Sequence, residues 1–457
     1  MEWWLYPKQE EADAPMPMRM IVAFYIIAIF GGLAIEIVNW PENKQVSLFF
    51  FVPSVLLPFS IVTAGVFILR MYNSALINYA EIRKYIAKQQ EISLKHYACQ
   101  NIALAAWSSI TPVEKLALNM LNLEGEFPQA PKTPLKIEMR EAFEKTANEQ
   151  LLTQLLASMA EKLKMNPYHN AEFFVWVRAG DEHCIEELRR SLDNFNLPSA
   201  RTCKINFIKE CPDYELVGHW IKQSNRCKIN IILITIDMHI DSDVDCNWME
   251  NASAFLFTNN YVRIEGEKPI YVYMPMSRVD VEDKMPVYLD VVPVSAPKVL
   301  WFTGLSGREK YPLLAALDAK GLAKVRLDLE ASVGRGSDGY RWLSMALAAE
   351  AVNYAQGNQL LADSSKKHFS ITALSSRLPN KPRPCEWGNW PLPAIESIIA
   401  GCFIGFVLFL IHVIINKSPP TIWGVIAWGV FSIIIPSLLG FLITDYSTSE
   451  ACKDMRR

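Results

Sequence analysis

The sequence lacks most of the short motifs that mark enzymes. Its 457 residues contain no G-x-S-x-G nucleophile turn, no phosphate loop ending in Gly-Lys-Ser/Thr and no H-E-x-x-H zinc motif. The nine cysteines form no C-x-x-C pair, and their odd number argues against a complete set of disulfides. We therefore assign no catalytic, cofactor-binding or metal-binding residue from the sequence, and we expect no cofactor.

The chain also has little net charge. It has 45 lysines and arginines and 48 acidic residues, which gives a formal net charge of −3. Such a balance offers no basic region for a polyanion, so we expect no nucleic acid partner. Charge is equally scarce in the middle of the longest apolar runs, where a proton or ion pathway would need it. A transporter or pump is therefore disfavoured.

Long apolar runs are what the sequence has in abundance. Hydrophobic residues make up 51% of the chain, and four runs are long enough to cross a hydrocarbon core of about 30 Å as helices. They form two pairs, at 20–71 and 394–444. The first run is not a cleaved signal peptide, because acidic residues precede it and it is too long. We predict four transmembrane helices that remain in the protein.

Basic residues flank these runs unevenly. Twelve lysines and arginines lie on one side, against only Lys44 and Lys417 in the two short loops on the other. The twelve fall within 8–19, 70–88, 377–383 and 453–457. Because positive residues favour the cytoplasmic side, both termini and the large region between the pairs are predicted to be cytoplasmic.

The region between the two pairs changes character part-way. Residues 72–165 are predicted to be a helical juxtamembrane region, which continues the second span through the segment NIALAAW. From 166 to 378, runs rich in β-branched and aromatic residues alternate with helical patterns, which is typical of an α/β domain with a parallel or mixed sheet. A Pro/Trp-rich linker at 379–393 returns to the membrane, and 1–19 and 445–457 are the cytoplasmic ends.

One stretch of the α/β domain matches a cofactor motif. Gly334, Gly336 and Gly339 spell G-x-G-x-x-G between a predicted strand, KVRLDL, and a predicted helix that begins at Tyr340. A dinucleotide fold places its first glycine directly at the strand end, whereas here EASV intervenes. Asp363 has about the right spacing for a ribose-binding acid but precedes the last predicted strand. We interpret the glycines as a structural turn, with anion contact or dinucleotide binding as alternatives.

An acidic segment, HIDSDVDCNWME, is the second candidate. It contains His239 and three alternating aspartates, as a calcium loop does. The aspartates are Asp241, Asp243 and Asp245. A calcium loop requires Gly at its sixth position and Glu at its twelfth, where this segment has Cys246 and Ala252. We interpret it as a solvated loop, with a looser metal site as the alternative.

Two cysteines come closest to a nucleophile. Cys184 stands beside His183 at the start of a predicted helix, and Cys246 stands among acids that would raise its pKa. Neither has the remaining elements of a catalytic set. We interpret both as ordinary thiols.

Two segments resemble the thiolase and ketoacyl-synthase family. The first, INIILITIDMHI…CNWMENASAFLFTNN, is similar to a strand, a loop and a "GEGAAALLL"-type strand, with Glu250, Ala252 and Ala254 at the small-residue positions. The second, VRLDLEASVGRGSDGYRWLSMALAAEAV, is similar to a later strand, glycine loop and helix. The similarity runs from Phe173 to Ser375 and implies a thiolase-like mixed sheet. The family's catalytic cysteine and two histidines have no matching motif here, so no active site carries over.

A degenerate thiolase-like domain between paired spans is similar to bacterial inner-membrane proteins that accompany type VI secretion effectors as immunity or accessory factors. This resemblance implies a non-catalytic protein whose partners are the lipid bilayer and an effector or secretion component, and it leaves a homo-oligomer open. Fold does not fix function. The alternatives are a membrane-bound thiolase-like enzyme acting on acyl or lipid substrates, and a sensor or channel gated by its cytoplasmic domain.

Overall fold

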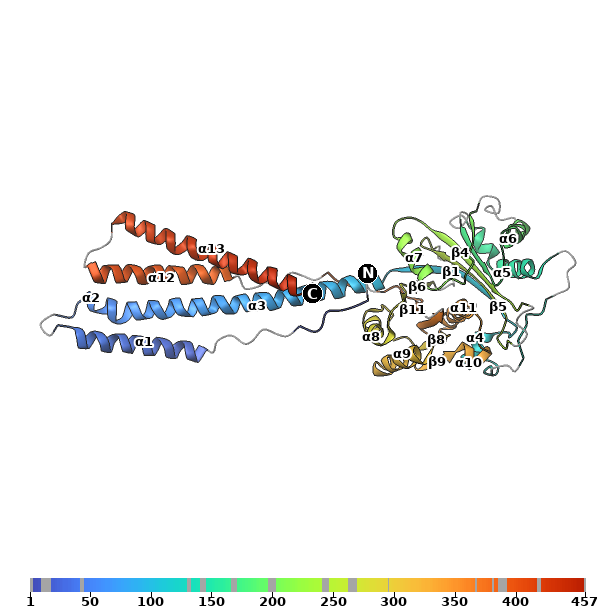
Figure 1. The fold of residues 1–457 in the computed structure, drawn as a ribbon, viewed down its shortest axis with the longest axis horizontal. Coiled ribbons are helices and arrows are strands. Elements are labelled where there is room, and N and C mark those ends of the chain that lie inside the picture. Colours follow the sequence, from blue (N-terminus) through green and yellow to red (C-terminus); the bar gives the residue numbers. More distant parts are fainter. Residues whose placement is uncertain are drawn as a thin grey trace. The chain divides into compact units, whose positions relative to one another are not determined.

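The chain divides into a helical unit and an α/β unit, which are drawn in Figure 1. The helical unit comprises Leu5–Ile92 and Pro384–Arg457, and the α/β unit comprises Met1–Trp4 and Ser93–Arg383. The structure is a computed structural model. It describes residues 3–9, 18–41, 45–129, 133–139, 145–165, 171–195, 203–240, 246–261, 269–294, 296–365, 368–379, 382–384, 393–416 and 421–455.

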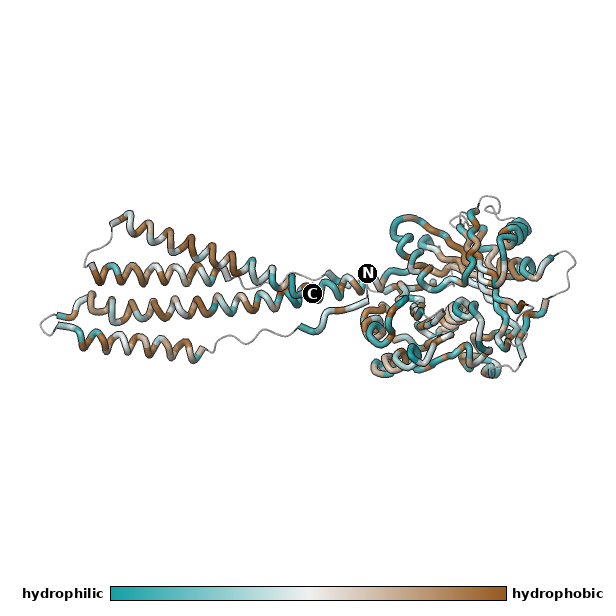
Figure 2. Tube along the Cα trace, in the orientation of Figure 1, coloured by the Kyte–Doolittle hydropathy of each residue, from teal (hydrophilic) through white to brown (hydrophobic). Residues whose placement is uncertain are grey.

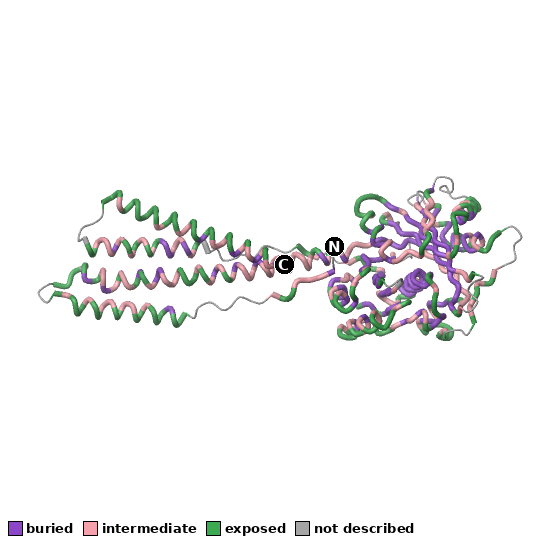
Figure 3. Tube along the Cα trace, in the orientation of Figure 1, coloured by how far each residue is buried: buried purple, intermediate pink, exposed green. Residues whose placement is uncertain are grey.

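The helical unit contains the four predicted spans, and the structure confirms each as a helix long and apolar enough to cross a membrane. Its elements are α1 (Met18–Asn39), α2 (Leu48–Phe51), the π-helical turn η1 (Val52–Leu56), α3 (Leu57–Ala98), α12 (Pro393–Asn416) and α13 (Ile422–Asp454). Apolar residues dominate the spans (Figure 2), and many are exposed (Figure 3). Apolar surface left exposed on so many helical faces is suited to contact with lipid.

Small residues let α12 and α13 pack closely. A Cβ atom added at Gly401 would lie 2.1 Å from Pro436 Cγ, and one added at Gly405 would lie 2.5 Å from Ser432 Cβ. The spacing of these two glycines is the G-x-x-x-G pattern of tightly packed membrane helices. The Ser397 hydroxyl also donates a hydrogen bond of 2.7 Å to the Pro436 carbonyl.

The α/β unit is built on an 11-stranded mixed sheet, which confirms the predicted fold class. The strands are β1 (Asn101–Ile110), β2 (Glu172–Val177), β3 (Ile205–Phe207), β4 (Asn230–Asp237), β5 (Asn251–Thr258), β6 (Ile270–Tyr273), β7 (Met276–Ser277), β8 (Val299–Thr303), β9 (Val325–Asp328), β10 (Gln359–Ser365) and β11 (His368–Ser375). Their order is β3-β2-β4-β5-β1-β6-β11-β10-β8-β9, and β7 pairs with β11.

The two halves of this sheet repeat one pattern. Read inward from one edge the order is β3-β2-β4-β5-β1, and from the other edge it is β9-β8-β10-β11-β6. In each half the three outer strands are parallel, and the fourth strand, β5 or β11, is antiparallel to the third. The fifth and innermost strand, β1 or β6, comes first in the sequence of its half and pairs antiparallel with the fourth. The halves join where β1 pairs antiparallel with β6.

Helices cover both faces of the sheet. They are α4 (Leu116–Met120), α5 (Ala147–Leu163), α6 (His183–Asn194), α7 (Glu215–Ser224), α8 (Val281–Val291), α9 (Gly307–Ala319), α10 (Leu329–Val333) and α11 (Tyr340–Asn353). One face carries α5 and α6, which form a core with alternate residues of β2, β4 and β5. On the opposite face Trp220 of α7 contacts Phe257, and Trp342 of α11 contacts Phe255. These two helices therefore share the second face.

One sequence-based prediction is wrong, and one strand was missed. Residues 101–110 were expected to continue a helix, yet they form β1 between β5 and β6. Their alanines and leucines favour a helix locally, but five consecutive buried residues on a central strand outweigh that preference. The strand β10 was also not anticipated, because QLLADSS is short and ends in polar residues. It lies parallel to β8, and its Asp363 is buried.

Candidate functional site

The glycine motif forms a tight turn against the body of the domain. Gly334 has φ +97°, and a Cβ atom there would lie 2.0 Å from the Asn247 carbonyl oxygen. Gly336 has φ +111° but more room, with Trp248 Cδ1 as its nearest neighbour at 3.5 Å. The EASV segment before the turn is part of α10, and α11 begins at Tyr340 as expected. Glycine is required here by backbone conformation and close packing.

The anion position at the start of α11 is taken by the protein itself. Asp237, at the end of β4, accepts hydrogen bonds from the Ser337 hydroxyl at 2.6 Å and the Gly339 amide at 2.8 Å. Arg178 lies 3.5 Å away. Burial raises the pKa of Asp237, and these donors oppose that shift. A carboxylate thus stands where a dinucleotide fold would hold phosphate, which supports the interpretation as a structural turn.

Asp363 is equally unavailable to a nucleotide. Its carboxylate lies 2.5 Å from Arg341 Nε, and both side chains are almost completely buried. Burial raises the pKa of Asp363, whereas the guanidinium opposes this shift. Arg341 also donates to the Pro212 carbonyl at 2.6 Å. This pair fastens α11 to β10 and to the loop before α7.

The acidic segment provides no assembled metal site. Asp241, Asp243 and Asp245 lie outside the described residues, where nothing tests their expected role. His239 Nε2 forms a hydrogen bond of 3.1 Å with the Trp248 carbonyl, and its Nδ1 lies 3.1 Å from Glu250 Oε1 without hydrogen-bond geometry. Among the described residues, no group of three histidine, cysteine or acidic side chains is placed to hold a metal.

The residues named by the thiolase resemblance have structural contacts. Glu250 accepts hydrogen bonds from the backbone amides of Ile137 and His239. Ala252 and Ala254 lie in β5, buried in the core beneath α5. Together they tie the segment around Ile137 to the sheet and permit close helix packing.

Four of the described cysteines have thiols that are poor nucleophiles. Burial raises the pKa of Cys184, and it raises that of Cys211 well above the ordinary value. The same cause raises the pKa of Cys99 and Cys203. Cys246 is partly exposed in a segment that follows the acidic loop. A thiol with a raised pKa is protonated at neutral pH and reacts slowly.

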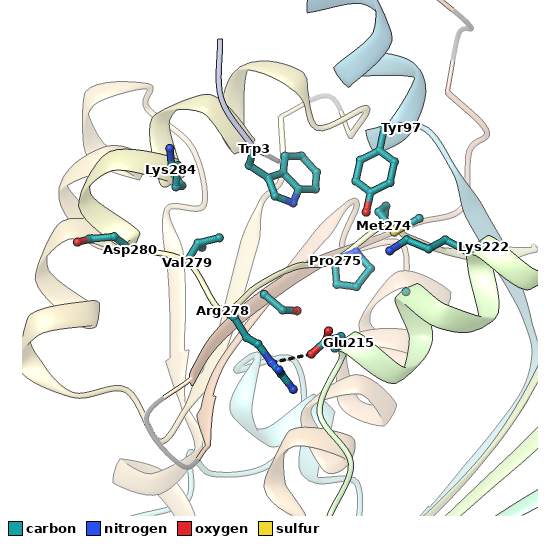
Figure 4. A pocket seen from close by; sticks show the side chains of 12 residues that line it. Trp3, Tyr97, Glu215, Lys222, Met274, Pro275, Arg278, Val279, Asp280 and Lys284 are labelled. Atoms are coloured by element: carbon teal, nitrogen blue, oxygen red, sulfur yellow. Dashed lines mark ion pairs between the residues drawn. The ribbon is translucent and has the colours of Figure 1, made fainter. Parts of the chain in front are cut away.

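The strongest candidate site is a pocket of about 500 Å³ within the α/β unit (Figure 4). Four parts of the chain form it: Trp3, Tyr97 at the end of α3, the exposed side of α7, and the segment from Met274 to Lys284. Sequence reasoning missed it because no local motif joins these positions. The only signal was indirect: two adjacent tryptophans near the start of an otherwise acidic leader.

Charge in the pocket is unevenly compensated. Arg278 Nε pairs with Glu215 Oε2 at 2.8 Å, and Asp280 accepts from the Glu282 amide at 3.0 Å as the N-cap of α8. Lys222 and Lys284 have no carboxylate within ion-pair distance in the part of the chain that the structure describes. The Lys222 ammonium lies 5.9 Å from the centre of the Tyr97 ring. With Asp280 counted, the five charged side chains that line the pocket carry a net charge of +1 beside a partly aromatic surface.

Aromatic side chains form one wall of this pocket. Trp3 is 6% exposed. Its ring centre lies 5.6 Å from that of Tyr97 and 5.2 Å from that of Tyr288, in edge-on and tilted arrangements. Such geometries are favourable for aromatic pairs. Trp3 is therefore held as firmly as a core residue, although it lies near one end of the chain.

No protein-family model and no curated protein matches this chain. Solved structures do match, although loosely. A type II polyketide acyl-carrier protein in complex with its ketosynthase has a TM-score of 0.46 and 8% identity, over 61% of this chain and 99% of that one. The OzmH ketosynthase domain of Streptomyces albus has a TM-score of 0.43 and 10% identity, over 63% and 100%.

A third match is the 3-oxoacyl-[acyl-carrier-protein] synthase III of Aquifex aeolicus. Its TM-score is 0.36 and its identity 11%, over 60% of this chain and 99% of that one. All three matches contain a ketosynthase or a 3-oxoacyl synthase. With TM-scores below 0.5, they support no transfer of residues, substrates or activity.

Proposed function

We propose that this chain is a membrane-anchored, non-catalytic binding protein whose α/β domain takes a protein partner at the pocket between α7 and α8. One observation carries the proposal: two lysines of the pocket, Lys222 and Lys284, have no carboxylate partner among the described residues. Elsewhere in the domain the charged groups described above are engaged within the protein. Unpaired charge beside aromatic surface is what a recognition site offers to a partner.

The enzyme alternative has weaker support. A thiolase-like reaction needs a thiolate, and burial raises the pKa of Cys99, Cys184, Cys203 and Cys211. The pocket itself is lined by none of these cysteines. A labelling experiment separates the two functions: a thiol-directed probe at neutral pH that modified one cysteine far faster than the others would favour the enzyme.

From the resemblance we propose that the partner is an effector or secretion component of a type VI system. The protein would bind it at the cytoplasmic face of a bacterial inner membrane. The solved structures named above are ketosynthases and add nothing to this assignment. Deletion of the gene should change killing or self-protection. If neither changes, and no secretion component is recovered with the tagged protein, the type VI assignment fails.

Site-specific photo-crosslinking tests the binding function directly. A photoreactive residue replaces Lys284 in the pocket, or as a control Lys324, which is exposed in the α9–β9 connection. In membranes of the native organism, position 284 should give a defined adduct and position 324 should not. The same adduct at both positions, or none at either, would contradict the proposal.

Accessibility of cysteines introduced at 324 and 417 would test the predicted orientation of the chain in the membrane.

A further inference from the structure

One side chain of the pocket, Trp3, indicates the chemistry of its partner. Met1–Trp4 belongs to the α/β unit, although residues 5–92 belong to the helical unit. Trp3 lines the pocket and inserts its ring beside Tyr97 and Tyr288. A side chain from a distant part of the sequence thus already occupies part of this site.

The remainder of the pocket is suited to a negatively charged chain. Lys222 comes from α7, Lys284 from α8 and Arg278 from the turn before α8, with Pro275 and Val279 between them in Figure 4. Arg278 is paired with Glu215, and Lys222 and Lys284 together outweigh Asp280, so a net positive charge is left to meet an incoming acid. The site therefore combines an aromatic slot with an adjacent region of positive charge.

The pocket also has polar groups for a peptide backbone. Ser277 Oγ is buried in its wall and has no hydrogen-bond partner among the described residues. A buried hydroxyl without a partner carries a desolvation cost, which an incoming amide or carbonyl would relieve. In the sequence Trp3 stands between Glu2 and Trp4, so an acidic residue and a second aromatic residue are its neighbours in the chain.

From these contacts we propose that the pocket is a peptide-recognition site for an acidic segment carrying an aromatic residue, and that Trp3 occupies its aromatic slot until such a segment displaces it. The inference rests on the proposed binding function and names the chemistry of the partner. The aromatic residue of the partner takes the place of Trp3 between Tyr97 and Tyr288. The acidic residue meets Lys222 and Lys284.

Because Trp3 is tethered, it competes at a high effective concentration with any peptide added in solution. Removal of its ring should therefore increase the apparent affinity for a peptide of the same sequence. The experiment uses the full-length protein in detergent and a fluorescein-labelled Met-Glu-Trp-Trp-Leu peptide, with binding followed by fluorescence anisotropy. Trp3→Ala should bind this peptide at least tenfold more tightly than the wild-type chain.

Two further comparisons test the charge requirement. Lys222→Glu combined with Lys284→Glu should weaken peptide binding at least tenfold, whereas Lys324→Glu should not. Peptides with both tryptophans replaced by alanine, or with the glutamate replaced by lysine, should bind at least tenfold more weakly. The lysine variants also keep the test valid if Trp3→Ala does not fold, since both lysines are at least partly exposed.

Several outcomes would overturn the inference. Equal binding by the wild-type and a folded Trp3→Ala chain would show that Trp3 does not compete. Equal effects of Lys324→Glu and of the pocket substitutions would show that the pocket is not the site. If these peptides fail while position 284 still crosslinks a protein in membranes, the binding function stands and only the acidic-aromatic ligand is excluded.

Discussion

Helices α7 and α11 hold corresponding places in the two halves of the sheet, each before the third strand of its half, yet they differ in burial. All but two of the 14 residues of α11 are buried, whereas only four of the ten residues of α7 are. The start of α11 is fastened by a buried ion pair, Arg341 with Asp363. The start of α7 carries Glu215, whose ion pair with Arg278 is exposed in the pocket.

This difference shows how one repeated arrangement can serve two purposes. The half that contains α11 uses its polar groups to close the domain, since its glycine turn and its ion pair are both engaged inside the protein. The half that contains α7 leaves one helix face open, and Glu215, Gly218 and Lys222 from that face line the pocket. The halves share a strand order but differ in the use of their corresponding helices, since α7 lines the pocket and α11 does not.

The largest effect is expected from breaking the buried pair at α11. Asp363→Asn leaves the Arg341 charge without its counter-ion in a site from which water is excluded. We expect the free energy of unfolding of the domain to fall by about 3–5 kcal/mol. Hydrogen exchange of β10 and α11 in the full-length protein would measure this loss.

The matched change at α7 is Glu215→Gln, which removes an exposed ion pair and should cost less than about 1 kcal/mol. The double variant Arg341→Met with Asp363→Leu should regain most of the stability lost in Asp363→Asn, because no buried charge is left alone. Similar losses for Glu215→Gln and Asp363→Asn would remove the contrast between the halves.

The glycine turn should show a graded response. Gly334→Ala places a Cβ atom 2.0 Å from a backbone oxygen at a φ of +97°, so the backbone must shift, and we expect a loss of about 3 kcal/mol. Gly336→Ala meets nothing closer than 3.5 Å and should cost about 1–2 kcal/mol from strain alone. Thermal unfolding of both variants would rank them, and the reverse order would contradict the packing described here.

A pH dependence is expected from the far end of α11. Burial raises the pKa of Glu350 from 4.5 to about 7. Above pH 7 the folded domain must hold this carboxylate ionised in a poorly solvated place. Below pH 7 the folded state takes up the proton before the unfolded state does, so the wild-type domain gains stability as the pH falls toward 4.5.

Glu350→Gln removes that titration. The variant should be more stable than the wild-type domain by about 1–3 kcal/mol at pH 8, and the difference should shrink toward zero by pH 5. Unfolding midpoints measured at several pH values would show the convergence. A constant difference between the two proteins would mean that Glu350 does not titrate in this range.

The smallest change in stability is expected at the pocket. Lys222→Glu and Lys284→Glu alter side chains that form no ion pair among the described residues, so each should change the free energy of unfolding by less than about 0.5 kcal/mol. These substitutions are expected to affect binding far more than stability. A large loss of stability would instead show that the lysines support the fold.

The sequence predicted the fold class and most elements because their signals are local. The four spans are apolar over their whole length, and β2, β4, β5 and β8 are rich in β-branched and aromatic residues. β1 was misread because NIALAAW has good helix formers and follows a 42-residue helix. This segment is a strand because it pairs with β5 and β6, and no local sequence pattern reveals that pairing.

The site was less predictable than the fold. The glycine motif and the acidic segment are visible because their residues stand close together in sequence, yet Gly339 and His239 contact groups of their own domain. The pocket joins Trp3 to Tyr97, to α7 and to the start of α8. Three of these four parts are ordinary in sequence, and only the folded sheet brings them together.

The place of β1 in the sheet has a consequence for biosynthesis. Its partner β5 begins about 140 residues after β1 ends. At a rate of synthesis of about 5–20 residues per second, β5 is therefore made on the order of ten seconds after β1. During that interval Asn101–Ile110 follows a finished α3 and has helix-forming residues of its own. The nascent chain can therefore extend that helix first and convert it to a strand only when β5 and β6 emerge.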